Sequence, residues 1–176
     1  MSDTPALLKR LKEAAFLEGD FTTRAGKKTT YYIDKYLFET RPDILDPLTD
    51  LMLSHFPPLD SFDRIAAPEL GAVPLASVLS IKSKKPFVIV KKGSKDYGTQ
   101  KLIEGKFVSG ERVVLVEDIL TTAGAAINAY NELTKNGLTV IKLIGVIDRE
   151  EGAAENVAKL NLPMSALFTR THLLAS

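Results

Sequence analysis

The sequence predicts an α/β fold with a mostly parallel central sheet flanked by helices. Two apolar runs carry this prediction, FVIV at residues 87–90 and VVLV at residues 113–116. Neither run alternates apolar with polar residues, so both faces of each strand need cover, as in parallel sheets between helix layers. Stretches of helical character come between the strand-like runs, which is the order typical of such a fold.

The first 54 residues are predicted to hold two helices and two strand-like pieces. Thr4 is placed to cap the first helix, and Pro5 suits its first position because the N–H that proline lacks would be unpaired there anyway. The strand-like pieces lie around residues 21–22 and 31–33, and the second helix is expected over 42–54.

From residue 64 onward, strands and helices alternate. Strands are expected over 64–67, 87–90, 112–116, 138–147 and 165–168, and helices over 71–79, 124–135 and 153–160. Ligands of open parallel sheets bind beyond the carboxyl ends of the strands, so the loops after these strands should face one crevice. The stretch 91–105 is long, polar and glycine-containing, which is typical of a lid or binding loop.

The composition fits a single domain over residues 1–176. Lys plus Arg number 23 against 22 Asp plus Glu, so there is no basic field for nucleic acid. The absence of cysteine excludes disulfides and Cys-ligated metals. No stretch has signal-peptide character or the length of a membrane span, so we expect a cytoplasmic protein that binds neither nucleic acid nor membrane.

The strongest motif is VVLVEDILTTAGAA at residues 113–126. A buried strand delivers two acids, Glu117 and Asp118, to its end, and a turn rich in Thr and small residues then opens a helix. Small residues let backbone N–H groups approach a phosphate, and the helix N-terminus adds favourable potential. The acids suit ribose hydroxyls or sugar-bound Mg²⁺. The alternative is that they only cap the helix, but the whole pattern favours a binding function.

This motif resembles the ribose-phosphate signature of type I phosphoribosyltransferases. Three further segments are similar to the orotate phosphoribosyltransferases within that family: FTTRAGKKTTYYID at 21–34, KKGSKDYG at 91–98 continuing to IEG at 103–105, and IDREEG at 147–152. PELGAVPLA at 68–76 stands in the place of the pyrophosphate loop. The resemblance covers most of the chain, with its segments in the family's order.

The resemblance implies a type I phosphoribosyltransferase-like fold, with a small hood formed mainly by residues 18–40 and 148–176. It implies a transferase of pyrimidine biosynthesis that converts orotate and phosphoribosyl diphosphate (PRPP) to orotidine 5′-phosphate and pyrophosphate. Mg²⁺ would be held mainly through the substrate, with no dedicated protein ligand. A homodimer with shared active sites is also implied.

The same resemblance assigns the substrate contacts. Glu117 and Asp118 would hold the ribose hydroxyls, and the 5′-phosphate would be bound by Thr121, Thr122, Ala123, Gly124 and Ala125. The pyrophosphate would meet Lys91, Lys92 and Lys95, and the groups assigned to catalysis are Lys92, Lys95 and Asp118. Further substrate-binding positions are Arg24, Tyr32, Ile33 and Tyr97. Arg149 would meet the orotate carboxylate through two parallel hydrogen bonds.

Each assignment has a plainer alternative. The loop lysines could form only a solvated surface, Arg149 could pair with Glu150 or Glu151, and for Tyr31 we favour packing. A phosphoribosyltransferase for a purine base is a second hypothesis, which Arg149 disfavours because a purine has no carboxylate. A non-enzymatic PRPP sensor is a third, and the net charge of +1 argues against the nucleic-acid surface that it would need.

Four positions depart from the family pattern. Lys91 replaces a usual Arg, Tyr97 a usual His, and Leu70 a Lys found in many members. Ala123 stands where Gly is more common, and we expect phosphate binding to survive if the backbone there keeps a negative φ.

Overall fold

The computed structural model describes residues 4–22, 26, 28–93 and 101–176. Its elements, in chain order, are α1 (Thr4–Ala15), β1 (Phe16–Thr22), β2 (Lys28–Ile33), α2 (Tyr36–Glu39), α3 (Pro42–Ser54), the 3₁₀ turn η1 (Leu59–Ser61), β3 (Arg64–Pro68), α4 (Ala72–Ser83), β4 (Phe87–Val90), β5 (Ile103–Glu104), β6 (Arg112–Leu120), α5 (Gly124–Lys135), β7 (Thr139–Asp148), α6 (Ala153–Ala158), β8 (Met164–Thr169) and α7 (Arg170–Ala175). Within these ranges, no helix is both long and apolar enough to cross a membrane.

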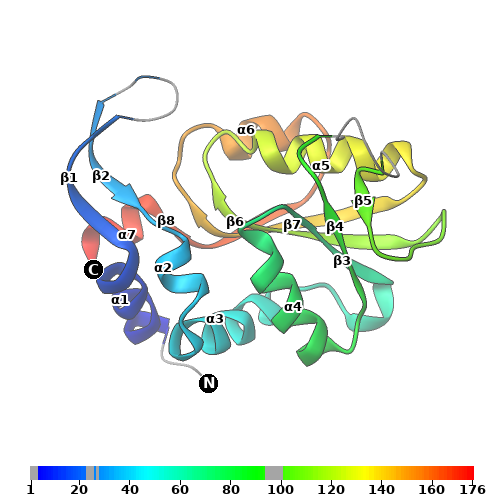
Figure 1. Ribbon diagram of the computed structural model, residues 1–176, viewed down its shortest axis with the longest axis horizontal. Helices are drawn as coiled ribbons and strands as arrows, with labels where there is room; N and C mark the ends of the chain where they lie inside the picture. Colours follow the sequence, from blue (N-terminus) through cyan, green and yellow to red (C-terminus); the bar gives the residue numbers. More distant parts are fainter. Residues whose placement is uncertain (1–3, 23–25, 27, 94–100) are drawn as a thin grey trace.

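The central sheet has six strands in the order β5-β4-β3-β6-β7-β8. All neighbours pair in parallel except β4 and β5, which are antiparallel. The prediction of a mostly parallel sheet is therefore confirmed. Figure 1 shows α5 and α6 along one face of this sheet and α3 and α4 along the other.

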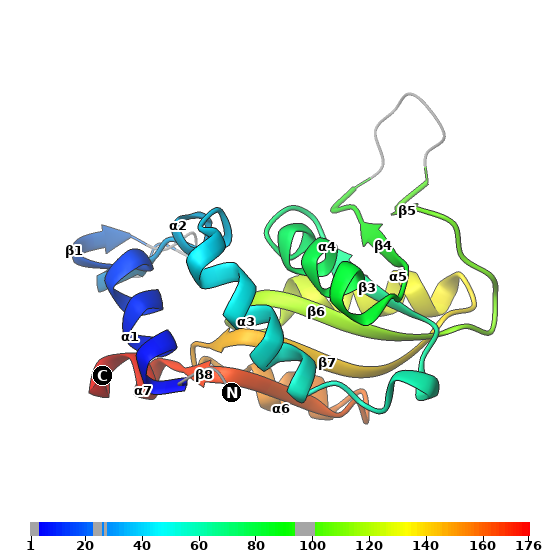
Figure 2. The same ribbon diagram turned by 90° about the horizontal axis from the view of Figure 1, so that it is seen from below.

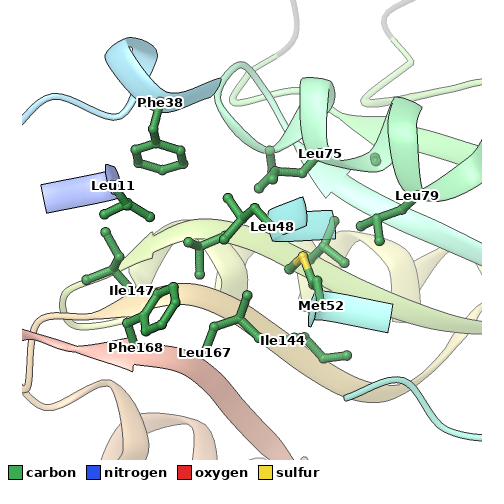
Figure 3. Packing of buried hydrophobic residues seen from close by; sticks show 14 of the residues in the cluster. Leu11, Phe38, Leu48, Met52, Leu75, Leu79, Ile144, Ile147, Leu167 and Phe168 are labelled. Carbon is green, nitrogen blue, oxygen red and sulfur yellow. The ribbon is translucent and has the colours of Figure 1, made fainter. Parts of the chain in front are cut away.

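The two faces explain why the VVLV run does not alternate. Val114 and Val116 belong to the core cluster on the side of α3 and α4, whereas Val113 and Leu115 belong to the cluster on the side of α5. All four are fully buried, and each side chain of this kind contributes about 1.5–3 kcal/mol by leaving water. Figure 3 shows the first cluster, in which strand residues such as Ile144 meet helix residues such as Leu48.

A second unit lies at one end of the sheet. β1 and β2 form an antiparallel hairpin, and α1, α2 and α7 lie beside it in both views (Figures 1 and 2). The hood predicted over 18–40 and 148–176 overlaps this unit through the hairpin, α2 and α7. The second range also includes α6 and β8, which are part of the layered domain because β8 pairs with β7. α1 joins the unit although it lies outside both ranges.

Two predicted boundaries changed in ways that matter for the site. The strand predicted over 112–116 continues to Leu120, because β7 keeps pairing with it as far as Asp148. Glu117 and Asp118 therefore lie within β6 and not after it. β5 was not predicted; its two residues pair with Ile89 and Val90 and shorten the long loop that follows β4.

Candidate active site

The loops at the carboxyl ends of the strands contact one another, as the parallel sheet requires. The N–H of Glu69, after β3, donates to the carbonyl of Val90 at 2.9 Å, and the N–H of Lys92 donates to the Glu69 carboxylate at 2.8 Å. The N–H of Arg149, after β7, donates to the carbonyl of Leu120 at 2.8 Å. Segments far apart in sequence thus form one rim around the ends of β3, β4, β6 and β7.

The two acids of β6 lie inside this rim. Glu117 is 5% exposed and Asp118 2%. Asp118 Oδ1 accepts a hydrogen bond from the N–H of Ile119, and Asp118 Oδ2 forms an ion pair with Lys35 Nζ at a distance of 2.6 Å. The N-cap of α5 is Ala123, and no side chain caps that helix. The interpretation that the acids only cap the helix is therefore wrong.

Gly71 gives the Lys35–Asp118 pair its room. A Cβ atom at position 71 would lie 1.7 Å from Asp118 Oδ2 and 2.6 Å from Lys35 Nζ. No side chain fits that space while the pair is formed. Gly71 follows a cis peptide bond between Glu69 and Leu70 and directly precedes α4.

The turn between β6 and α5 holds the predicted phosphate contacts. The backbone N–H groups of the first turn of α5 have no partner within the helix, which leaves them free for an anion. Thr122 and Gly124 are exposed at this turn, and Ala123 is buried. Ala123 has φ +60°, so the expectation of a negative φ there is wrong. The sharp change from strand to helix places this residue in the left-handed region, which costs an L-residue about 1–2 kcal/mol.

Arg149 lies beside the same turn. Its Nη2 pairs with Glu151 Oε1 at 2.8 Å, and its guanidinium carbon lies 5.5 Å from the centre of the Tyr31 ring. Its Nε is buried and has no hydrogen-bond partner among the residues described. The predicted alternative, an ion pair with a neighbouring Glu, is thus present, and one guanidinium donor is still unused.

The predicted pyrophosphate lysines are only partly described. Lys91 Nζ pairs with Glu104 at 2.7 Å across the β4–β5 ladder, so its charge is engaged within the loop base. Lys92 reaches the rim through its backbone N–H. Lys95 and Tyr97, and also Arg24, fall outside the described residues.

Successive residues of β2 point to opposite faces of the hairpin. Ile33 is 4% exposed and belongs to the core, so the predicted contact of its side chain with substrate disagrees with its position. Tyr32 points the other way, is 47% exposed, and packs against Phe21 with ring centres 5.7 Å apart. Tyr31 stacks on Phe16 at 5.1 Å, in agreement with the packing that we favoured for it.

Lys35 and Glu39 are site residues that the sequence did not reveal. They lie one helical turn apart at the two ends of α2. Glu39 is 2% exposed, and neither of its carboxylate oxygens has a hydrogen-bond partner in the described part of the chain. Burial, followed by the charge of Asp118, raises the pKa of Glu39 to about 8, although Lys35 acts to lower it. A charged pair spaced i, i+4 just after the YYID segment is the one signal that could have suggested them.

Glu117 completes the group. Its Oε1 accepts from the N–H of Asp118 at 3.3 Å, and its Oε2 is buried without a partner in the described ranges. Burial, together with the charge of Asp118, raises its pKa well above the usual value. Over the ranges that the structure covers, no cluster of three or more acids or histidines is arranged to hold a metal ion, and Mg²⁺ stays a prediction.

A cavity of about 640 Å³ lies next to the rim, between the end of β4 and α5. Lys91, Lys92 and Pro68 line one side of it, and Asn128 and Glu132 line the other. Ala125 of the predicted phosphate-binding turn also lines this cavity, whereas the acids of β6 do not.

Comparison with known proteins decides the family. Residues 44–161 match the family model described as a phosphoribosyl transferase domain. The orotate phosphoribosyltransferase of Methanocella arvoryzae is 43% identical over 96% of this chain and 95% of that protein. This chain belongs to the orotate phosphoribosyltransferase family. The family resemblance and enzyme class predicted from the motifs are therefore confirmed.

Solved structures of this family have the same fold. The crystal structure of orotate phosphoribosyltransferase from Aeropyrum pernix has a TM-score of 0.88 and 30% identity, covering 96% of both chains. The Mycobacterium tuberculosis enzyme in complex with 5-phospho-α-D-ribosyl 1-diphosphate has a TM-score of 0.81 and 25% identity, covering 97% of this chain and 98% of that one. The predicted type I phosphoribosyltransferase-like fold is confirmed by these similarities.

Proposed function

We propose that this chain transfers ribose 5-phosphate from PRPP to orotate, giving orotidine 5′-phosphate and pyrophosphate. One observation carries the proposal: a buried ionic group at the end of β6 is directly followed by the open N-terminus of α5, with a half-used guanidinium beside both. Those three features match the hydroxyls, the 5′-phosphate and the base carboxylate of the two substrates.

The reaction needs placement and charge more than a protein nucleophile. A ring nitrogen of orotate attacks C1 of the ribose as the bond from C1 to the pyrophosphate oxygen breaks, and positive charge develops on the sugar. Asp118 and Glu117 would fix the ribose hydroxyls, and the N–H groups opening α5 would hold the 5′-phosphate. Groups that are already oriented in this way lower the activation barrier, because they hold the reactants in place and stabilise the charge that develops in the transition state. Lys92 and Lys95 would face the departing pyrophosphate.

We also propose that Mg²⁺ enters the site with PRPP. Mg²⁺ prefers oxygen ligands and keeps several waters, so it binds readily to phosphate oxygens with few protein ligands. The carboxylates of β6 would then contact the sugar, and the metal would neutralise charge on the leaving pyrophosphate. A cytoplasmic location remains a prediction.

A homodimer is a further part of the proposal, and α4 supports it. This helix is mostly apolar, and Ile81 on it is 67% exposed. Leu70, just before it, is 63% exposed. If subunits share sites, exchange between Lys95→Ala and Asp118→Asn proteins should restore about a quarter of wild-type activity by two-fold symmetry. No recovery after proven exchange would contradict shared sites.

The substrate is tested by supplying PRPP, Mg²⁺ and one base at a time, with orotate, uracil, adenine and hypoxanthine as the panel. We expect turnover with orotate alone. Arg149→Ala should lower kcat/KM for orotate by about 30-fold or more, the equivalent of breaking a charge-assisted pair worth at least about 2 kcal/mol. The KM for PRPP should change little.

Arg41→Ala is the matched control for that substitution. Arg41 also pairs with an acid, with its Nη2 2.7 Å from Asp43, but both side chains are about half exposed. We expect near wild-type kinetics from it. Equal losses for orotate and PRPP in Arg149→Ala would show that Arg149 is structural, and turnover of a purine would overturn the choice of acceptor.

A further inference from the structure

The contact between Lys35 and Asp118 joins two regions that are 83 residues apart in sequence. Lys35 precedes α2 in the hood unit, and its side chain is 28% exposed against 3% for Asp118. The Nζ–Oδ2 distance is 2.6 Å, and the Lys35 Nζ also lies 5.5 Å from the centre of the Tyr36 ring. The ammonium is therefore held on its own side by an aromatic ring and on the other by a buried carboxylate.

The charges around this contact are unequal in number. Three carboxyl groups act on one ammonium: Glu39 on the hood side, and Glu117 and Asp118 on β6. Burying several like charges with one counter-ion is unfavourable, so such groups take up protons until the cluster is near neutral. Glu39 and Glu117 are the deeply buried members, and burial together with the nearby charge of Asp118 favours their neutral forms. Asp118 alone has the direct cation.

Two donors fix the orientation of Asp118. Its Oδ1 accepts from the N–H of Ile119 and its Oδ2 from Lys35. Gly71 lies against Oδ2 without a side chain, which leaves room for the Lys35 ammonium. A turn of the carboxylate away from this orientation would break both hydrogen bonds.

We propose that Lys35 is a positioning residue, whose ammonium holds the Asp118 carboxylate in the orientation that receives the ribose hydroxyls of PRPP. This inference rests on the proposed function, and it assigns the hood unit a part in binding the sugar. A hydroxyl donates well to a carboxylate oxygen only over a limited range of directions, so a cation that fixes the carboxylate favours ribose binding.

The test is kcat/KM for PRPP in Lys35→Met. Methionine keeps much of the stem and removes the charge. We expect kcat/KM for PRPP to fall about 10-fold or more, as for a lost hydrogen bond between charged groups, while the KM for orotate changes little. An unchanged kcat/KM for PRPP, or an equal loss for orotate, would overturn the proposal.

A double-mutant cycle shows whether Lys35 acts through Asp118. PRPP binding, measured by calorimetry, should weaken in Lys35→Met, but adding the same change to Asp118→Asn should cost at most about 2-fold, since neighbours that share one interaction are not additive. Equal losses in both backgrounds would show that Lys35 acts elsewhere. Lys35→Arg should restore part of the binding, because it returns the charge.

Two further measurements protect this test. Lys82→Met is the matched control, since Lys82 pairs with Asp46 and Asp50 on α3 and is 19% exposed, away from the rim. It should leave kcat/KM for PRPP unchanged. If Lys35→Met fails to fold, PRPP binding by Lys35→Arg and by the double variant, which has no unpaired carboxylate at 118, still reports on the coupling. Calorimetry needs no acceptor base, so failure to use orotate would sink the proposed function without deciding this inference.

Discussion

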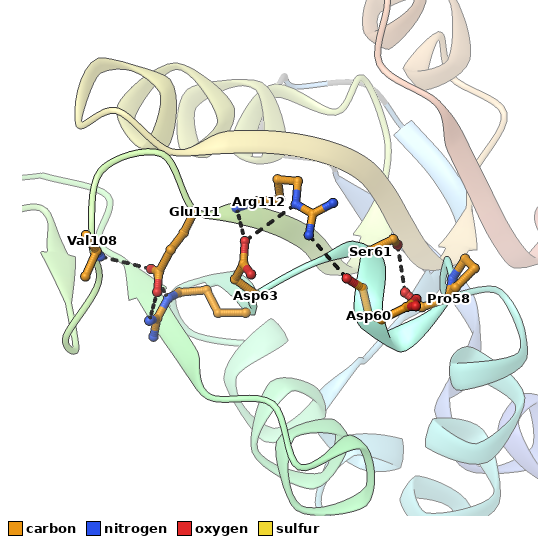
Figure 4. Close-up of polar contacts among 8 residues, drawn as sticks. Pro58, Asp60, Ser61, Asp63, Val108, Glu111 and Arg112 are labelled. Carbon is orange, nitrogen blue, oxygen red and sulfur yellow. Dashed lines mark hydrogen bonds and ion pairs between the residues drawn. The ribbon is translucent and has the colours of Figure 1, made fainter.

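The central strands carry a buried ion pair at each end, and the two pairs differ in how well they are satisfied. At the amino ends, Arg64 and Glu111 form a bidentate pair with both N–O distances 2.7 Å, and Glu111 also accepts the N–H of Val108 at 2.9 Å (Figure 4). At the carboxyl ends, Asp118 has a single cation, and the oxygens of Glu39 beside it have no partner within the described ranges.

The difference indicates that the two pairs have different roles. A pair in which both carboxylate oxygens bind a guanidinium holds strands together and offers little to a ligand. Buried polar atoms without partners are costly, so a group of them at the ligand-binding edge of the sheet is consistent with selection for binding. Substitutions at the amino ends should therefore change stability, and those at the carboxyl ends should change activity.

Asp118→Asn should give the largest effect. The variant loses the charge that faces the ribose, and we expect kcat/KM for PRPP to fall by about 100-fold or more, in the range seen for lost electrostatic contacts at reacting centres. Thermal melting should show a folded protein. Near wild-type kcat/KM would contradict the assignment of the motif and remove the contrast between the two ends.

Glu39→Gln tests the unsatisfied side through stability. The pKa of Glu39 is raised from its usual 4.5 to about 8, so the folded state prefers its protonated form. Protonated Glu39 therefore stabilises the folded state fully below the pKa of the unfolded state. This stabilisation is lost as pH rises through the pKa of the folded state. The wild type should thus lose stability relative to Glu39→Gln between about pH 5 and pH 8, by at most about 1.4 kcal/mol per pH unit. Urea midpoints across that range check this, and a difference independent of pH would refute it.

Glu111→Gln tests the satisfied side. The amide cannot accept both guanidinium bonds, and we expect the free energy of unfolding to fall by about 2 kcal/mol, less than for a fully buried pair because Glu111 is 21% exposed. Activity per folded molecule should be kept. Asp43→Asn is the control: Arg41 and Asp43 form the same bidentate contact, but both are about half exposed, and no measurable loss is expected. A large activity loss in Glu111→Gln would contradict the division between a structural pair at the amino ends and a functional group at the carboxyl ends of the strands.

Ala123→Gly should give the smallest effect. Glycine adopts φ +60° without the Cβ penalty, so we expect a gain of about 1 kcal/mol in the free energy of unfolding, or about 2–4 °C in Tm. The KM for PRPP should stay within about 2-fold, because the turn already has the left-handed geometry. A lower Tm would show that the neighbours of Ala123 need its methyl group.

Local pattern predicted what is encoded locally. The bounds of α3 and α5, and the acids followed by the Thr-rich turn, were evident because a proline at the start of α3, the Asn136–Gly137 stop after α5 and continuous apolar runs are read within one short window. The pairing of Lys35 with Asp118 was not evident, because it depends on how the hood packs against β6. The choice between Tyr32 and Ile33 was a matter of strand parity, which two adjacent apolar residues leave undecided. The sign of φ at Ala123 followed from the turn, against the preference of alanine.

Gly71 has a consequence for how this chain can vary. Its backbone, at φ −64° and ψ −37°, is ordinary for any amino acid, so conformation places no demand for glycine there. The demand comes only from Asp118 Oδ2, which would lie 1.7 Å from an added Cβ. Every missense change from a glycine codon adds that atom. Position 71 is therefore closed to gradual substitution, and a lineage could alter it only after abandoning the Lys35–Asp118 pair.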